Sequence, residues 1–279
     1  MKDDQIYISN YAVAFIDLLG QRDDMRRHRT LPNDKEEAVR IVKESVGKVA
    51  GMHKTFERFY DSFEGAPSLF ENLSSEQKAE LPSMNRGQLR TQRFSDGLVV
   101  YASLAEAGGQ SPINSVYGLI SAAGSLALIQ LAAKRPVRIG IDIGWGVELQ
   151  PGELYGAALA HAYELESQVA QWPRAVVGAD LINYLETCRN SEGDSLNEQY
   201  RRAMGSECIA RIIEDLDGSP VVDFAGSAFL RNAPEEEVRN ALADAKQFVN
   251  EQLEIWSAQG HVTLTGRYQC LQQYLSTRS

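Results

Sequence analysis

This sequence has few cysteines, little clustered positive charge and no long apolar run, and each shortage excludes a class of function. Its three cysteines are far apart and odd in number, which argues against a disulfide framework and a cysteine metal site. Its four histidines show no spacing typical of metal ligands. No apolar run approaches the roughly 20 residues of a membrane span, and the N-terminus lacks the basic-then-apolar order of a signal peptide. We therefore expect a cytoplasmic protein without a membrane partner.

The net charge of −10 argues against nucleic acid as the main partner, because binding to a phosphate backbone needs clustered lysine and arginine. The local basic group "QRDDMRRHR" is diluted by its own acids. An anionic ligand would therefore need a metal ion or backbone amides to hold it. Both possibilities direct attention to the carboxylates.

Strand-like and helical segments alternate along the chain. "YAVAFIDLL" and "PVRIGIDIGWGVEL" predict buried strands, while residues 34–60 and 113–133 predict helices with Asn33 or Asp34 as the first N-cap. Residues 64–86 are rich in Gly, Pro and Ser and predict an inserted loop with a short helix. The pattern favours an α+β sheet with helices packed on one face over a doubly wound sheet. We expect one catalytic-type domain over residues 1–224 and a helical extension over residues 225–279.

Two aspartates occupy the positions where carboxylates are least expected in such a sheet. Asp17 ends the first strand, and Asp96 lies at the tip of a hairpin predicted by "RFSDGLVVYA". If the hairpin pairs with the first strand, both carboxylates lie at one end of the sheet and can hold a hard divalent cation. The simpler alternatives are an ordinary Asp-Gly turn and a helix cap formed by Asp17.

Four segments, "FIDLLG", "RFSDGLVVYA", "PVRIGIDIGWG" and "ELYGAALAHAYELES", resemble in this order the signature segments of class III nucleotidyl cyclases. The resemblance covers roughly residues 8–224. It is closest to the short bacterial pyrimidine cyclases of the Pycsar anti-phage system. It implies a ferredoxin-like cyclase core, a homodimer with sites at the interface, and two divalent ions, Mn²⁺ or Mg²⁺, in each site.

Carried over by position, the resemblance assigns Asp17 and Asp96 as the metal aspartates and the carbonyl of Leu18 as a backbone ligand. The amides from Leu18 to Gln21, which include Leu19 and Gly20, match the phosphate cradle, and Phe15 opens the same segment. The chain departs from purine cyclases on the helix after "YG", where Ala160 and Glu164 replace the expected Asn and Arg.

A substitute for the missing catalytic arginine must come from elsewhere. Arg93 is the first candidate because it precedes the metal hairpin, and Arg138, His161 and Tyr163 are alternatives. The base-reading positions match Gln92 and Glu153, which form neither of the purine-specific pairs. A Gln amide can donate to or accept from either pyrimidine.

The sequence thus predicts a metal-dependent enzyme that converts UTP to 3′,5′-cyclic UMP and pyrophosphate, as a messenger for a partner effector in anti-phage defence. A cytidylate cyclase making cyclic CMP remains open, as does a degenerate cyclase-like module that senses a nucleotide without converting it. A phosphohydrolase using the same carboxylates is a weaker alternative. Candidate dimer surfaces are the helices over residues 113–133 and 153–167.

Overall fold

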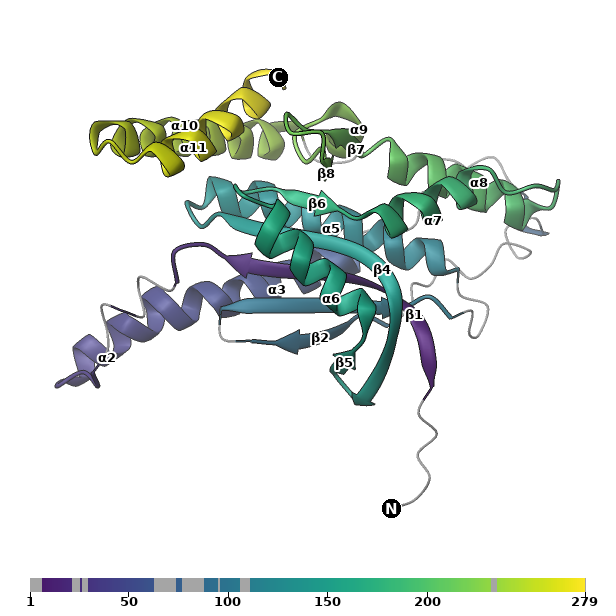
Figure 1. Cartoon of the computed structure of the whole chain (residues 1–279), viewed down its shortest axis with the longest axis horizontal. Coiled ribbons are helices and arrows are strands. Elements are labelled where there is room, and N and C mark those ends of the chain that lie inside the picture. Colours follow the sequence, from purple (N-terminus) through teal and green to yellow (C-terminus); the bar gives the residue numbers. More distant parts are fainter. Residues whose placement is uncertain are drawn as a thin grey trace, which may run out of the picture.

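A computed structural model describes residues 7–21, 26, 30–62, 74–76, 88–94, 96–105, 111–231 and 235–278. The loop with a short helix predicted over residues 64–86 falls almost entirely outside these residues. The sheet has eight strands in the order β2-β3-β1-β4-β6-β8-β7, with β5 paired to β4. All pairings are antiparallel except that of β4 with β6. The expected α+β class is confirmed (Figure 1).

The strands are β1 (Ile8–Leu18), β2 (Arg90–Arg93), β3 (Gly97–Ser103), β4 (Val137–Gln150), β5 (Glu153–Tyr155), β6 (Ala175–Val177), β7 (Ile212–Glu214) and β8 (Pro220–Val222). The first half of the chain contributes the helices α2 (Lys35–Ile41), α3 (Gly47–Ser62) and α5 (Pro112–Ala132), with the π-helical segment η1 (Val42–Val46) joining α2 to α3. The second half contributes α6 (Ala157–Glu164), the π-helical segment η3 (Leu165–Val169), α7 (Ala179–Arg189), α8 (Leu196–Ile209), α9 (Ser227–Leu230), α10 (Glu235–Ala258) and α11 (Val262–Ser276).

The main hydrophobic core lies between the sheet and α3 and α5. Alternate residues of β1, including Ala12, Ala14 and Ile16, join this core with buried residues of both helices. The intervening β1 residue Val13 belongs to a smaller cluster beneath α6 on the opposite face. Successive side chains of a strand point to opposite faces. Alternate residues of β1 therefore face either the main core under α3 and α5 or the smaller cluster under α6. The face under α6 also carries Asp17.

Helix α5 is the central helix of the core. It is long and apolar enough to cross a membrane, but 83% of its most apolar window is buried inside the protein. Its burial leaves little of it exposed for a second copy, so the expectation that it forms a dimer surface is wrong. Helix α10 packs beside α5 and shares the main core through Ala245 and Val249. The C-terminal helices lie along one side of the molecule, over α5 (Figure 1).

Local sequence explains several element boundaries. Asp34 caps α2 as expected, because its carboxylate accepts a hydrogen bond from the amide of Glu37 at 2.7 Å. The β2–β3 hairpin also forms where it was predicted, and the amide of Phe94 donates to the carbonyl of Gly97 at 3.1 Å. Helix α8 and strand β7 were not predicted. The signals for α8 were present, since Ser195 accepts a hydrogen bond from the amide of Glu198 at 3.2 Å and the buried residues Tyr200, Met204 and Cys208 follow at four-residue intervals.

Candidate functional site

Strand register brings the two predicted aspartates to the same end of the sheet. Asp17 lies opposite Gly97 in the pairing of β1 with β3, so Asp96 is the immediate neighbour of its partner. Gly97 is the first residue of β3, and a side chain there would place its Cβ 3.3 Å from the carbonyl oxygen of Ile16. The glycine therefore allows the hairpin end to lie close against β1, and its φ is not in the left-handed region that an Asp-Gly turn would use.

Arg138 lies on the other side of Asp17. The two residues are paired in the register of β1 with β4, and Nη2 of Arg138 is 3.0 Å from Oδ2 of Asp17. The same nitrogen is 2.6 Å from Oε1 of Glu166. One guanidinium thus joins two carboxylates from different elements. Arg138 was only an alternative in the sequence analysis, and the structure places it nearest to Asp17 among the cations considered there.

Glu166 is a buried carboxylate that sequence reasoning missed. Its side chain is 3% exposed. Burial, together with the smaller effect of the charges of Asp17 and Asp96, raises its pKa to about 7 against the lowering effect of Arg138. Both aspartates are therefore close enough to act on it electrostatically. The available signal was helical spacing, because Glu166 follows the buried Ala158 and Ala162 at four-residue intervals.

Gly140 on β4 allows α6 and η3 to bring Glu166 to this position. A Cβ at Gly140 would lie 2.1 Å from the carbonyl oxygen of Ala162 and 2.6 Å from the amide nitrogen of Glu166. The helix backbone can approach the strand this closely only because no side chain intervenes. The "GID" segment of β4 thus has a direct geometric role in forming the site.

Aromatic side chains lie beside the carboxylates. Phe15 is on the same face of β1 as Asp17 and stacks on Phe94 with ring centres 6.0 Å apart. Tyr163 of α6 meets Phe15 edge to face at 5.2 Å. Phe94 is 43% exposed and Tyr163 is 51% exposed, so this group offers ring surface to a flat ligand.

The predicted base-reading residues also come together. Oε1 of Gln92 accepts a hydrogen bond from the amide of Leu154 at 3.1 Å, which places Gln92 beside the strand that carries Glu153. Oε2 of Glu153 accepts from Nε2 of Gln150 at 2.8 Å. This hydrogen bond fixes the orientation of the Gln92 side-chain amide. If the amide were flipped, its NH2 group would face the N–H of Leu154, and two donors cannot form a hydrogen bond.

The predicted phosphate cradle is only partly available. Leu18 is buried and ends β1, while the amide of Leu19 donates to the carbonyl of Pro136 at 3.0 Å. That amide already has a protein partner. The following Gly20 has a φ of +88° and turns the chain away from the strand, so the cradle is reduced to the turn at Gly20 and Gln21.

Arg93, the first candidate for a catalytic cation, lies on the other face of the sheet. It is paired with Leu98, and Leu98 is paired with the core residue Ile16. Its guanidinium forms an exposed ion pair with Glu57 of α3, at 3.6 Å. Within one chain, the geometry therefore favours Arg138 over Arg93 as the cation acting beside Asp17.

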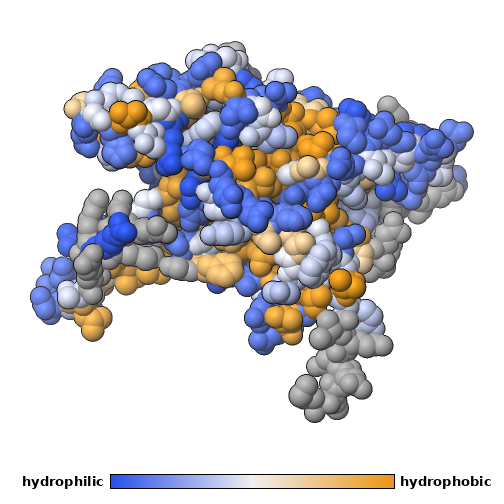
Figure 2. Space-filling view, in the orientation of Figure 1, coloured by the Kyte–Doolittle hydropathy of each residue, from blue (hydrophilic) through white to orange (hydrophobic). Residues whose placement is uncertain are grey.

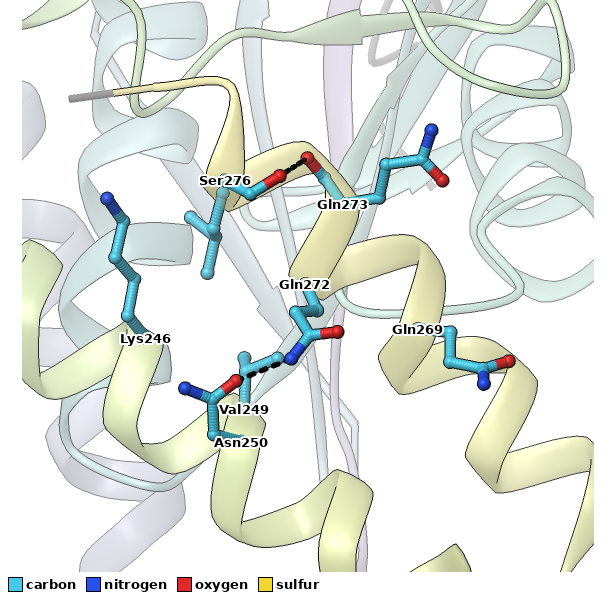
Figure 3. A pocket seen from close by; sticks show the side chains of 8 residues that line it. Lys246, Val249, Asn250, Gln269, Gln272, Gln273 and Ser276 are labelled. Atoms are coloured by element: carbon cyan, nitrogen blue, oxygen red, sulfur yellow. Dashed lines mark hydrogen bonds between the residues drawn. The ribbon is translucent and has the colours of Figure 1, made fainter.

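A hollow of about 550 Å³ lies elsewhere, between α10 and α11 (Figure 3). Half of its lining residues carry amide side chains, and Gln272 donates to Asn250 across it at 2.7 Å. None of the predicted site residues lines it. This hollow is therefore not part of the predicted site.

No family model and no curated protein sequence matches this chain. Among similar solved structures, a bacterial light-regulated adenylyl cyclase has a TM-score of 0.40 and 17% identity, over 64% of this chain and 45% of its own. The adenylyl cyclase CyaB from P. aeruginosa has a TM-score of 0.42 and 10% identity, over 65% and 83%. A class III adenylyl cyclase-like ATP-binding protein from Pseudomonas aeruginosa has a TM-score of 0.42 and 13% identity, over 74% and 43%. This chain thus spans less than half of the first and third of these proteins, and similarity at this level carries no information about its substrate.

Proposed function

We propose that this chain is a metal-dependent nucleotidyl cyclase that converts UTP to 3′,5′-cyclic UMP and pyrophosphate. The observation that carries the proposal is the register of Asp17 opposite Gly97, which brings Asp17 and Asp96 to one end of the sheet. Two carboxylates in that arrangement suit hard divalent cations such as Mn²⁺ or Mg²⁺, which prefer oxygen ligands. The nearby buried Glu166 adds negative charge, and Arg138 offsets only part of it.

In this proposal Asp17, Asp96 and the carbonyl of Leu18 hold the cations. When bound, the ions neutralise phosphate charge and lower the pKa of the ribose 3′-hydroxyl. The 3′-oxygen then attacks the α-phosphorus in line, the bond to the β-phosphate oxygen breaks, and the hydroxyl proton passes to solvent. The turn at Gly20 and Gln21 faces the phosphates. Arg138 supplies the positive charge that Glu164, at the usual arginine position, cannot.

The orientation of Gln92 supports uracil as the base. Because Oε1 of Gln92 accepts from the Leu154 amide, the group left to meet a ligand is the amide nitrogen, a donor. Uracil has an acceptor oxygen at position 4, where cytosine has an amino donor. A fixed donor therefore complements uracil, and the exposed rings of Phe94 and Tyr163 supply surface on which the base can stack.

The proposal includes a homodimer acting in the cytoplasm. Large apolar side chains are exposed at the β4–β5 end, where Trp145 is 45%, Leu149 is 57% and Tyr155 is 63% exposed. Orange surface is visible over this end of the sheet in Figure 2. Such clustered apolar surface is typical of interaction sites. A molar mass measured by light scattering would show a dimer if this surface joins two copies, and a monomer at all concentrations would contradict it.

The setting that we propose is anti-phage defence, in which cyclic UMP activates a partner effector. This part rests on the resemblance of the signature segments to pyrimidine cyclases. It predicts that cells carrying the chain accumulate cyclic UMP during phage infection. Unchanged cyclic UMP levels in infected cells, with an enzyme active in vitro, would reject the setting and leave the activity intact.

The test of the activity is incubation of the purified protein with ATP, GTP, CTP and UTP separately, with Mn²⁺, followed by mass spectrometry. We expect cyclic UMP from UTP and little product from the other three. Cyclic CMP as the dominant product would identify a cytidylate cyclase instead. Hydrolysis to nucleoside diphosphate or monophosphate without a cyclic product would indicate a phosphohydrolase.

One observation favours a sensor as the second candidate. Ala160 and Glu164 are exposed on α6, and neither can perform the function of the Asn and Arg expected there. A chain that binds a nucleoside triphosphate but does not convert it would show saturable heat release in calorimetry and no product by mass spectrometry. Binding together with turnover would exclude this reading.

A further inference from the structure

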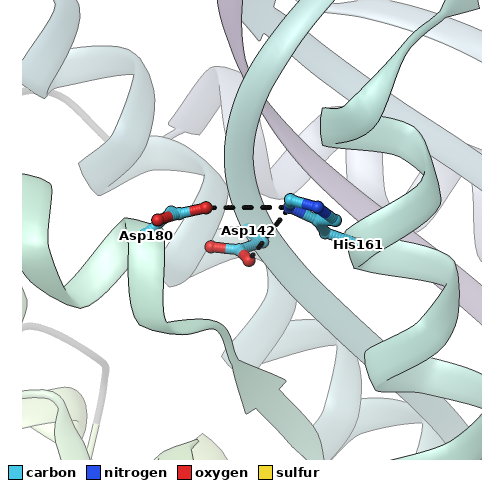
Figure 4. Close-up of side chains that lie close together, drawn as sticks. All are labelled: Asp142, His161 and Asp180. Carbon is cyan, nitrogen blue, oxygen red and sulfur yellow. Dashed lines mark ion pairs between the residues drawn. The ribbon is translucent and has the colours of Figure 1, made fainter.

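A second group of potential metal ligands lies farther along β4, on the same face as Arg138. It consists of Asp142 on β4, His161 on α6 and Asp180 in the first turn of α7 (Figure 4). One ligand atom from each residue lies within 4.8 Å of the others, and no other group of three His, Cys, Asp or Glu residues does so in the described part of the chain. Asp142 is four strand residues from Arg138, or about 13 Å at 3.3 Å per residue.

The spacing of these atoms fits a shared cation better than direct contact. Nδ1 of His161 is 3.8 Å from Oδ2 of Asp142 and 3.7 Å from Oδ2 of Asp180. Both separations exceed those of a hydrogen bond, roughly 2.7–3.2 Å. Two ligands each about 2.1 Å from one tetrahedral zinc ion lie about 3.4 Å apart. A small adjustment of exposed side chains would therefore complete the coordination.

The Asp142 carboxylate is held in place before any ion binds. Its side chain is 7% exposed, and Oδ1 accepts a hydrogen bond from the amide of Leu181 at 2.9 Å. Gly178 leaves the space that the carboxylate occupies, since a Cβ there would lie 2.1 Å from Cγ of Asp142. Oδ1 of Asp142 thus has a structural role, because it accepts a hydrogen bond in the first turn of α7. Oδ2 of the same carboxylate is directed toward His161.

The simpler reading is that His161 forms ordinary ion pairs with both aspartates. His161 is 42% exposed and Asp180 is 57% exposed, so their side chains have room to approach each other more closely. Nδ1 of His161 instead lies at nearly equal distances from Oδ2 of Asp142 and Oδ2 of Asp180. A buried carboxylate also gains more from a bound cation than an exposed one, because its hydration has already been lost.

We propose that Oδ2 of Asp142, Nδ1 of His161 and Oδ2 of Asp180 bind one divalent transition-metal ion, with Zn²⁺ as the matching probe and water at the open position. One nitrogen and two carboxylate oxygens form a ligand set that zinc accepts. The ion joins β4, α6 and α7, and so fixes the helix that continues into the turn carrying Glu166. This site is separate from the proposed nucleotide site and does not depend on its activity.

The test is calorimetric titration of the full chain with Zn²⁺ after treatment with a chelator. We compare wild type with Asp180→Asn and His161→Gln, which change exposed or half-exposed side chains, and with Asp244→Asn, an exposed aspartate on α10. We expect both site variants to bind Zn²⁺ at least about tenfold more weakly, and Asp244→Asn to match wild type. Asp17→Asn should also retain this binding event.

Melting temperature provides an independent measurement. Zn²⁺ should raise the melting temperature of wild type and of Asp244→Asn, since a ligand of the folded state stabilises it by mass action, and should raise that of Asp180→Asn much less. Wild type without saturable Zn²⁺ binding would overturn the proposal. So would equal affinities in wild type, His161→Gln and Asp180→Asn.

Discussion

Arg138 is the residue on which the chemistry of the carboxylate end depends most. It contacts Asp17 at 3.0 Å and Glu166 at 2.6 Å, so it links a proposed metal ligand to a buried acid. Even when Glu166 holds a proton, the two aspartates Asp17 and Asp96 carry two negative charges, and Arg138 supplies one positive charge. Additional positive charge is therefore favourable here, and this is the electrostatic reason for expecting divalent cations.

Glu166 predicts a specific dependence of stability on pH. Its pKa rises from 4.5 to about 7 on folding, so between these values the folded state holds a proton that the unfolded chain releases. The free energy of unfolding should therefore fall as pH rises through this window, by about 3 kcal/mol at most. Glu166→Gln should remove this fall, as measured by urea denaturation in metal-free buffer.

The control for this measurement is Glu164→Gln, which removes an exposed carboxylate at the end of α6, directly before η3. It should keep the pH dependence of wild type. Identical pH profiles for wild type and Glu166→Gln would contradict the proposed ionisation of Glu166.

Gln92 predicts how the choice of base can be changed. Gln92→Glu keeps one oxygen for the Leu154 amide and replaces the outward donor by an acceptor. It should shift the ratio of CTP to UTP turnover about tenfold toward CTP, since one hydrogen bond contributes roughly 1.4 kcal/mol. Competition of the two nucleotides in one reaction measures the ratio, and an unchanged ratio would show that Gln92 does not contact the base.

At the scale of elements, α6 determines which side chains reach the site. It crosses the sheet face that carries Asp17 (Figure 1). It places Tyr163 beside β1, and its continuation η3 places Glu166 beside β4. The helix can do so because the facing residues are small enough to let its backbone approach the sheet closely. These residues are Ala158 and Ala162 on α6 and Gly140 and Gly144 on β4.

This packing predicts that Gly140→Ala is strongly destabilising. The new Cβ would lie 2.1 Å from a backbone oxygen of α6, so the helix must move away from the strand. We expect a loss of about 1–3 kcal/mol in the free energy of unfolding and reduced cyclase activity. Gly266→Ala is the matched control, because a Cβ there meets nothing within 4 Å, and it should be neutral or stabilising by up to about 1 kcal/mol. Equal effects of the two changes would contradict the close approach.

The sequence could predict the elements better than the contacts between them. Periodicity located β1, α5 and β4, since each has a clear apolar pattern, and the Asp-Gly signal located the β2–β3 hairpin. The pairing of Asp17 with Arg138 depends on register across 121 residues, which no local pattern reports. The incorrect choice of Arg93 as the catalytic cation could have been avoided, because adjacent strand residues face opposite sides of a sheet. If Gln92 is on the face of Asp17, Arg93 is not. His161 meets its carboxylates only through tertiary packing, which explains why its spacing gave no metal signal.

At the scale of the whole molecule, the C-terminal helices are fastened to the sheet through Tyr274. Its hydroxyl donates to Oδ1 of Asp223 at 2.9 Å and accepts from the amide of Ala225 at 3.0 Å. Arg278 contacts the same carboxylate at 3.0 Å. The domain boundary expected between residues 224 and 225 stays a prediction. The residues that Tyr274 contacts, Asp223 and Ala225, lie on either side of it.

Tyr274→Phe therefore tests whether the extension and the sheet unfold together. Loss of the hydroxyl leaves the Ala225 amide without this acceptor, which should cost about 1–3 kcal/mol. We expect one cooperative transition at lower urea concentration, seen by both circular dichroism and tryptophan fluorescence. Two separate transitions would indicate an extension that folds independently of the sheet.

The measurement that tests the central claim most directly is UTP turnover by wild type and by Asp96→Asn in parallel reactions that both contain Mn²⁺. Asp96→Asn removes one charge at the hairpin tip with little change in shape. We predict cyclic UMP and an equal amount of pyrophosphate from wild type, and a loss of about 100-fold or more in the variant, with an unchanged melting temperature. Equal cyclic UMP production by the two proteins would contradict the assignment of the carboxylate end as the catalytic site.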